Sequence, residues 1–251
     1  MEEELKKNLV FLQARIDSKR LPRKVLQHIN GRAMIDLQIE RIQQAKLIQG
    51  VVVLIPDTVE NDELHTHLLK IGIPTFRGSL NNVYERYLNA SKVHPSDSII
   101  RLTADCPLVM PKLIDQMIGR FELGDIDYLS NSLIETFPDG LDIEIVKSSA
   151  LEALLGMNIN ENEKEHVTLG IYQRPNTFKI ENFQNEINLG DHRWTVDYEE
   201  DFSFITRVFN YFKGKESSFE MADVLKFIEN HPEAKNTRTS DYRNISLKKS
   251  E

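Results

Sequence analysis

The sequence predicts an α/β protein built on a mostly parallel β-sheet. Continuous apolar runs alternate with amphipathic helical segments in the first half of the 251 residues, as in strands covered by helices on both faces. After about residue 131 the rhythm changes, because LDIEIV (141–146) alternates with period two and predicts a half-exposed antiparallel strand. We therefore expect one domain over 1–251, with a core at about 8–212, an inserted antiparallel element at about 132–185 and a C-terminal helix and polar tail at about 216–251.

The expected elements follow in order along the chain. Strands are predicted at 8–13, 51–56, 74–76, 98–103, 127–131, 141–146, 178–183 and 192–196. Helices are predicted at 33–46, 61–71, 81–93, 111–121, 148–156, 163–173, 199–212 and 219–229. Gly72 is a plausible C-cap of the second helix, and Pro111 stands at a permitted early position of the fourth.

Composition excludes several classes of protein. The formal net charge of -8 argues against general nucleic-acid binding, which uses a basic face. A single cysteine rules out an internal disulfide and indicates a reducing compartment. The segment MEEELKKN (1–8) lacks the apolar core of a signal peptide, and no apolar run approaches membrane-spanning length. We expect a cytoplasmic protein that binds neither nucleic acid nor a membrane.

The stretch QARIDSKRLPRKVL (13–26) concentrates positive charge on this acidic chain, with five basic residues in ten positions. It follows the first strand, at the edge where open α/β sheets bind ligands. It contains no glycine before Gly31, so phosphates would be held by side chains, namely those of Arg15, Ser18, Arg20 and Lys24. The alternative is a solvated basic turn, but the position favours phosphate binding.

Two carboxylates each follow a predicted strand. Asp105 lies in RLTADCP (101–107) and Asp197 in HRWTVD (192–197). Delivered to one sheet edge, they could share Mg²⁺, which takes one or two carboxylates and completes its shell with phosphates and water. The alternative for each is a helix cap. Cys106 is expected to be buried rather than a nucleophile, because no base stands beside it.

Six stretches, in family order over about residues 8–212, resemble the cytidylyltransferase superfamily that makes CMP-activated sugar acids. They are QARIDSKRLPRKVL, FRGSLNNVYERY (76–87), RLTADCPL (101–108), FPDGLDIEI (137–145), EKEHVT (163–168) and HRWTVD. Within the superfamily the chain is most similar to the SpsF branch of spore-coat polysaccharide biosynthesis proteins. The resemblance implies a Rossmann-like nucleotide-diphospho-sugar transferase (GT-A-like) fold, CTP as donor, Mg²⁺ as cofactor and a homodimer. We expect the 132–185 element to make the dimer contact, because its alternating strand would expose an edge.

The resemblance also implies roles for individual residues. The catalytic residues would be Arg15, Lys24, Asp105 and Asp197, of which the two aspartates would hold the metal. The nucleotide would be bound by Gln13, Ala14, Arg15, Ser18, Arg20, Lys24, Arg77, Ser79, Arg86, Thr103 and Asp105. The acceptor would be bound by Asp139, Asp142, Glu144, Glu165 and His166.

Each of the less specific assignments has a structural alternative. Arg86 could lie on a solvated helix face, and Asp142 and Glu144 could lie on the wet face of an antiparallel strand. His166 could be a structural histidine, and Trp194 is expected in the core. The family usually has glycine in place of Arg23 and of Ala104.

The expected reaction is attack of an acceptor oxygen on the CTP α-phosphate with release of pyrophosphate, in surface polysaccharide or glycoconjugate biosynthesis. The acceptor stays open between a nonulosonic acid, another sugar acid and a phosphorylated metabolite. Rival readings are a sugar-1-phosphate nucleotidylyltransferase, which typically carries a glycine-rich first loop, a glycosyltransferase of related fold, and a non-catalytic nucleotide-binding protein. The presence of both Asp105 and Asp197 counts against the last.

Overall fold

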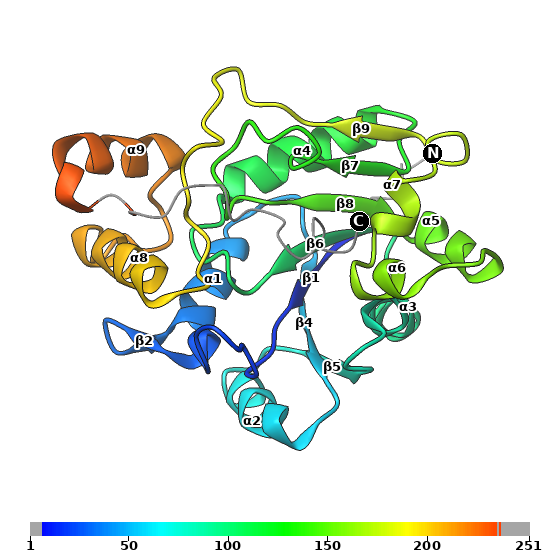
Figure 1. Ribbon diagram of the computed structural model, residues 1–251, viewed down its shortest axis with the longest axis horizontal. Coiled ribbons are helices and arrows are strands. Elements are labelled where there is room, and N and C mark those ends of the chain that lie inside the picture. Colours follow the sequence, from blue (N-terminus) through cyan, green and yellow to red (C-terminus); the bar gives the residue numbers. More distant parts are fainter. Residues whose placement is uncertain (1–6, 235, 237–251) are drawn as a thin grey trace.

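The structure, a computed structural model, describes residues 7–234 and 236, and its centre is a seven-stranded sheet (Figure 1). The strand order is β5-β4-β1-β6-β8-β7-β9. β8 is antiparallel to both neighbours, and the other pairings in this sheet are parallel. The predicted mostly parallel fold with an antiparallel insertion is therefore confirmed. The strands are β1 (Asn8–Gln13), β4 (Gly50–Pro56), β5 (Thr75–Gly78), β6 (Ser98–Thr103), β7 (Tyr128–Ser130), β8 (Glu144–Lys147) and β9 (Ile180–Asn182).

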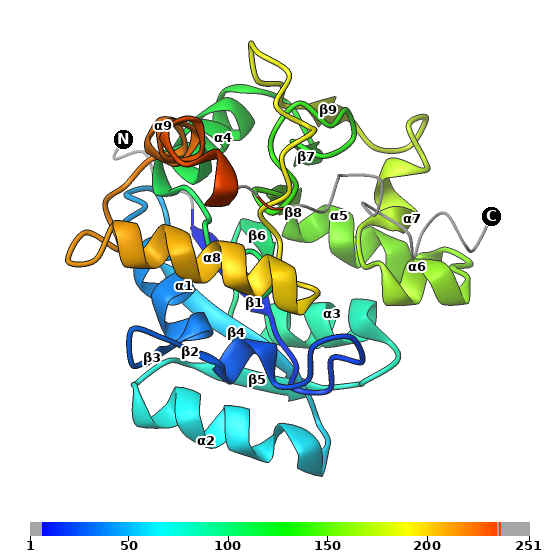
Figure 2. The ribbon, with the colours of Figure 1, turned by 60° about the vertical axis from the view of Figure 1, so that its left-hand side comes forward.

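Helices cover both faces of the sheet, with α1, α8 and α9 on one side and α3, α5, α6 and α7 on the other (Figures 1 and 2). Alternate residues of β1 enter separate apolar clusters, Val10 and Leu12 on the first face and Phe11 on the second. No helix among the described residues is both long and apolar enough to cross a membrane. The helices are α1 (Met34–Ile42), α2 (Asp62–Lys70), α3 (Val83–Val93), α4 (Pro111–Leu123), α5 (Ser148–Ala153), α6 (Glu161–Glu165), α7 (Leu169–Tyr172), α8 (Glu199–Tyr211) and α9 (Met221–Asn230).

The expectation of a half-exposed strand at 141–146 is wrong. β8 lies inside the sheet between β6 and β7, and its first three residues are buried. Glu144 can be buried there because it is ion-paired with Arg101 and accepts hydrogen bonds from Tyr128 and Thr168. The sheet edge within 132–185 is β9 and not the alternating strand, and the homodimer stays a prediction.

Two further predicted elements differ in the structure. The helix expected at 163–173 is divided into α6 and α7, because Val167 has a φ of 43° and interrupts the helical backbone. The strand expected at 192–196 does not form. Apart from one isolated bridge between Asp139 and Arg193, the backbone there bonds to loops. The predicted C-terminal tail lies mostly outside the described residues.

A short hairpin precedes α1 that the sequence analysis did not predict. β2 (His28–Ile29) and β3 (Arg32–Ala33) are antiparallel. The two residues between them, Asn30 and Gly31, have φ values of 53° and 78°. Positive φ at both positions is the type I′ requirement that Asn-Gly meets, so this dipeptide was a usable signal.

Candidate active site

A cavity of about 860 Å³ opens where β1 and β6 end. Twelve of the predicted site residues line it, and they come from the basic loop, α3, the end of β6, the α6 region and the segment before α8. They are Gln13, Ala14, Arg15, Ser18, Arg20, Lys24, Arg86, Thr103, Asp105, Glu165, His166 and Asp197. The structure thus gathers most of the predicted nucleotide and metal residues around one space.

The basic loop is folded back on itself by its own backbone. The amides of Ser18 and Arg23 both donate to the carbonyl of Ile16, at 2.8 and 3.0 Å. The Ile16 amide donates to Asn61 Oδ1 at 2.9 Å, which ties the loop to the start of α2. Ile16 and Leu21 are buried, whereas Arg15 and Arg20 are exposed. Apolar residues therefore anchor the loop while the side chains of Arg15 and Arg20 stay exposed.

Arg23, where the resemblance led us to expect glycine, has a φ of 60°. This left-handed conformation costs a residue with a Cβ about 1–2 kcal/mol, and glycine adopts it freely. Arg23 Nη2 also contacts Glu63 Oε1 at 2.5 Å, in a pair in which both side chains are more than half exposed. The glycine expected at this position from the resemblance would avoid this cost, and Arg23 is not among the residues that line the cavity described above.

Arg23→Gly is expected to leave the free energy of unfolding unchanged or raise it by up to about 1 kcal/mol, because relief of the backbone offsets the loss of a weak surface pair. Arg23→Ala removes the same pair but keeps the Cβ, so it should bring no gain. Urea unfolding of both variants measures the difference. If Arg23→Gly is less stable than Arg23→Ala, the left-handed backbone at position 23 does not cost the protein stability.

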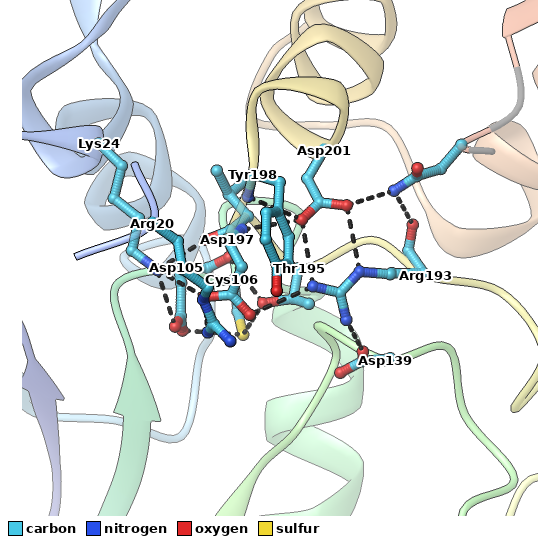
Figure 3. Close-up of polar contacts among 12 residues, drawn as sticks. Arg20, Lys24, Asp105, Cys106, Asp139, Arg193, Thr195, Asp197, Tyr198 and Asp201 are labelled. Carbon is cyan, nitrogen blue, oxygen red and sulfur yellow. Dashed lines mark hydrogen bonds and ion pairs between the residues drawn. The ribbon is translucent and has the colours of Figure 1, made fainter. Parts of the chain in front are cut away.

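Four charged side chains from the cavity lining, those of Arg20, Lys24, Asp105 and Asp197, lie in contact with one another (Figure 3). The ammonium of Lys24 donates to Asp105 Oδ2 at 3.2 Å, to Asp197 Oδ1 at 3.1 Å and to the carbonyl of Val196 at 2.6 Å. Arg20 Nη2 lies 2.8 Å from the same Asp197 oxygen. The predicted convergence of the two carboxylates is therefore seen, and Lys24 bridges them.

Backbone hydrogen bonds between loops bring Asp197 close to Asp105. Asp197 does not follow a strand, contrary to the prediction from the sequence. The Val196 amide donates to the carbonyl of Asp105 at 2.8 Å, and the Trp194 amide donates to that of Asp139 at 2.6 Å. Trp194 is buried in the core, as predicted. The helix-cap alternative for Asp197 is wrong, because the N-cap residue of α8 is Tyr198. Asp201 accepts the amide hydrogens of Asp197 and Tyr198 at 2.9 and 3.0 Å. The Asp197 side chain lines the cavity.

Arg193 contacts Asp197 from the side opposite Lys24 (Figure 3). Its buried guanidinium donates to Asp139 at 2.7 Å, to both oxygens of Asp201 at 3.1 Å and to Asp197 Oδ2 at 3.2 Å. Asn236 donates to Asp201 at 2.8 Å and closes the network. Arg193 was not among the residues predicted from the sequence. The spacing of Arg193, Asp197 and Asp201 by four residues was the available signal.

The cluster keeps its charges at neutral pH. Burial alone would raise the pKa of Asp105, but the Lys24 ammonium and a hydrogen bond from Thr103 lower the pKa to about 2. Burial would lower the pKa of Lys24, and the two carboxylates raise it instead. Each partner is therefore ionised because the other is present.

Arg86 is a buried cation of this cavity and not the solvated helix residue that was the alternative. It is 3% exposed, and its Nε donates to the carbonyl of Ser79 at 2.9 Å. Among the described residues it forms no ion pair with a carboxylate, and burial lowers its pKa. A desolvated guanidinium on the wall favours an anionic ligand.

Five predicted residues lie outside the cavity lining. Arg77 is held by Asp57 at 2.9 Å and Asp62 at 2.6 Å, and the Ser79 hydroxyl accepts the Asn82 amide hydrogen and so fixes the start of α3. Asp139 pairs with Arg193, and Glu144 is buried as described above. Asp142 precedes β8, so the two carboxylates do not share a solvent-facing strand. Arg77, Ser79, Asp139 and Glu144 thus make contacts within the protein, and contact of any of the five residues with substrate stays a prediction.

The family follows from comparison with known proteins. A family model described as "Cytidylyltransferase" matches residues 9–238. The chain belongs to the cytidylyltransferase family. It is therefore a nucleotidyltransferase, and the cavity described above is the candidate active site of this enzyme.

Individual relatives agree with this assignment. The cytidylyltransferase is similar to the solved structure of a cytidylyltransferase from Leptospira borgpetersenii, with 33% identity, a TM-score of 0.87 and coverage of 93% of this chain and 98% of that one. It is 29% identical to spore coat polysaccharide biosynthesis protein SpsF of Bacillus subtilis over 93% of this chain and 98% of that protein. A CMP:2-keto-3-deoxy-manno-octonic acid synthetase, solved with CTP, shares the fold at 15% identity, with a TM-score of 0.64 over 82% of this chain and 99% of that one.

The residues of the cytidylyltransferase fit a hard divalent cation. Carboxylate oxygens of Asp105 and Asp197 approach one point closely enough to share a single ammonium. No group of three or more His, Cys, Asp or Glu side chains able to hold a metal occurs in the described part of the chain. Two carboxylates suit Mg²⁺, which binds such sites together with substrate phosphates.

Cys106 is buried, which raises the pKa of its thiol well above the ordinary value and agrees with an inert side chain.

Proposed function

We propose that this cytidylyltransferase transfers CMP from CTP to a sugar acid or a phosphorylated small molecule, releases pyrophosphate and uses Mg²⁺. The observation that carries the proposal is the pairing of Asp105 and Asp197 across one cation in a cavity with a basic loop on its wall. The CTP complex of a structural neighbour of the same fold supports the choice of donor. The likeness to SpsF supports a place in surface polysaccharide or glycoconjugate biosynthesis.

The chain's own residues account for binding and alignment. Arg15, Ser18 and Arg20 would hold the triphosphate by charge-assisted hydrogen bonds, because their side chains line the cavity. Mg²⁺ held by Asp105 and Asp197 would supply positive charge at the α-phosphate and acidify an attacking hydroxyl. An acceptor oxygen then forms a bond to the α-phosphorus as the bond to the bridging oxygen of pyrophosphate breaks. Catalysis is thus mainly positioning and charge neutralisation.

The acceptor would enter along the wall formed by the α6 region. Glu165 and His166 line the cavity there. Burial lowers the pKa of His166, so its imidazole is neutral at pH 7 and can accept a hydrogen bond from an acceptor hydroxyl. A phosphorylated acceptor, already ionised, would need no base.

CTP with Mg²⁺ is expected to raise the melting temperature more than ATP, GTP or UTP, because a ligand that binds only the native state stabilises it. Pyrophosphate release from each nucleotide, measured with pools of sugar acids and of phosphorylated metabolites, then identifies donor and acceptor together. Equal shifts for the four nucleotides would refute selectivity for cytosine. Absence of CTP-dependent pyrophosphate release with every acceptor would refute the transfer reaction.

A further inference from the structure

Lys24 occupies the position between the two aspartates that the proposed cation would need. All three hydrogens of an ammonium can be donated, and Lys24 has three acceptors within 3.2 Å: Asp105, Asp197 and the carbonyl of Val196. The residue is only 8% exposed. Its ammonium is therefore fully engaged by the site and has little water to replace these partners.

We propose that Lys24 acts as a positioning residue that reserves the two-aspartate site, so that a divalent cation binds there only together with the nucleotide triphosphate. The inference rests on the proposed function, since it assumes a nucleotide-dependent cation. It adds an order of binding and assigns that order to one side chain.

The two cations compete for the same oxygens. Mg²⁺ takes oxygen ligands at about 2.0–2.1 Å, whereas Nζ of Lys24 lies 3.2 Å from Asp105 Oδ2 and 3.1 Å from Asp197 Oδ1. A divalent ion bound to both carboxylates would lie against the ammonium, where like charges repel strongly in a partly desolvated site. Occupation by Lys24 and occupation by the metal therefore exclude each other.

The charge of Asp105 is compensated by Lys24 alone, whereas that of Asp197 has further partners among the described residues. Asp197 also contacts Arg20 and Arg193, but Lys24 is the one cation within ion-pair distance of Asp105 among the described residues. The Asp105 side chain is 30% exposed, so withdrawing Lys24 alone would leave a partly buried carboxylate without its counter-charge, which is unfavourable. Lys24 is therefore expected to leave only when another cation replaces it.

The triphosphate is the group able to draw Lys24 away. Lys24 lines the same cavity as Arg15 and Arg20, and it begins a short 3-10 turn, Lys24–Leu26. The proposed exchange requires a rotation of its side chain toward the triphosphate. Phosphate oxygens would then receive the ammonium as the aspartates receive the metal. Nucleotide and metal affinities are coupled, and by linkage the coupling is reciprocal.

Mn²⁺ binding to the full-length protein, followed by electron paramagnetic resonance, tests the proposal without turnover. Without nucleotide, the unmodified protein should bind Mn²⁺ weakly, and Lys24→Gln should bind it about tenfold more tightly or better. Lys24→Arg, which keeps a cation at this position, should bind Mn²⁺ as weakly as the unmodified protein.

Lys19→Gln is the matched control, because Lys19 lines the cavity on the same loop but has no ion pair with either aspartate. It removes the same charge and should leave Mn²⁺ affinity within about twofold, since Lys19 is exposed and salt screens the charge of an exposed side chain more than that of the buried Lys24. An equal gain in Lys19→Gln and Lys24→Gln would replace the proposal with a general field effect.

Tight Mn²⁺ binding by the nucleotide-free, unmodified protein would overturn the inference, even if Lys24→Gln failed to fold. That result would leave the proposed function standing. A ternary complex with CTP that adds no Mn²⁺ binding beyond that of CTP alone would instead count against the metal in the proposed function.

Discussion

Asp105→Ala and Asp197→Ala are each expected to lower turnover by at least about 100-fold, because both carboxylates would organise the α-phosphate and the attacking oxygen through one cation. The double variant should be little worse than the more damaging single one, since residues that act as a unit give non-additive losses. Pyrophosphate release and melting temperature, measured on the three variants, check both statements.

The matched control is Asp125→Ala, which removes an exposed carboxylate that pairs with Lys147 and Lys179 far from the cavity lining. Its turnover should be unchanged, and its stability should fall by no more than about 1 kcal/mol. Near-normal turnover in Asp105→Ala would contradict the proposed metal site and most of the proposed mechanism. Strictly additive losses would mean that the two aspartates act separately.

Arg193→Met is expected to cost about 3–5 kcal/mol of stability, because it leaves three carboxylates around a buried position without their shared cation. Arg193→Lys keeps the charge but not the planar fork that meets several carboxylates at once, so we expect an intermediate loss. Arg193 donates a hydrogen bond to Asp197 Oδ2 and so orients this carboxylate. Turnover of Arg193→Lys should therefore also fall, and the Mg²⁺ concentration needed for half-maximal turnover should rise.

Denaturant unfolding and Mg²⁺-dependent turnover measure these effects. Arg120→Met is the control, since Arg120 also contacts a carboxylate, Glu181, but 43% of its side chain is exposed. It should cost no more than about 1 kcal/mol and leave the Mg²⁺ requirement unchanged. A folded Arg193→Lys variant with an unaltered Mg²⁺ requirement would limit Arg193 to a structural role.

Local patterns were sufficient where the signal and the structure lie in the same short segment. The apolar runs at 8–13 and 98–103 form β1 and β6, as predicted. A short continuous apolar run is typical of a strand that helices cover on both faces of a parallel sheet. The basic loop and Asp105 follow those strands directly, so their place at the cavity could be predicted from chain order alone.

Patterns failed where a distant residue changed the meaning of a local one. Asp142 and Glu144 gave 141–146 the period of a half-exposed strand, but Arg101 compensates Glu144 from 43 positions away and allows β8 to lie inside the sheet. The segment 192–196 has strand-like residues, yet its amides bond to the carbonyls of Asp139 and Asp105 in loops. Neither partner is marked in the segment itself.

The sequence by itself determined the fold class, the basic loop and the two aspartates, because each depends on residue type and order along the chain. Only the tertiary structure decided how their charges are shared: Lys24 lies between Asp105 and Asp197, and Arg193 stands behind them. Ion pairs depend on distances of a few ångströms between groups that are 81 and 173 positions apart. Such distances are set by packing of the whole domain, since Coulomb energies fall with separation in space and not with separation in sequence.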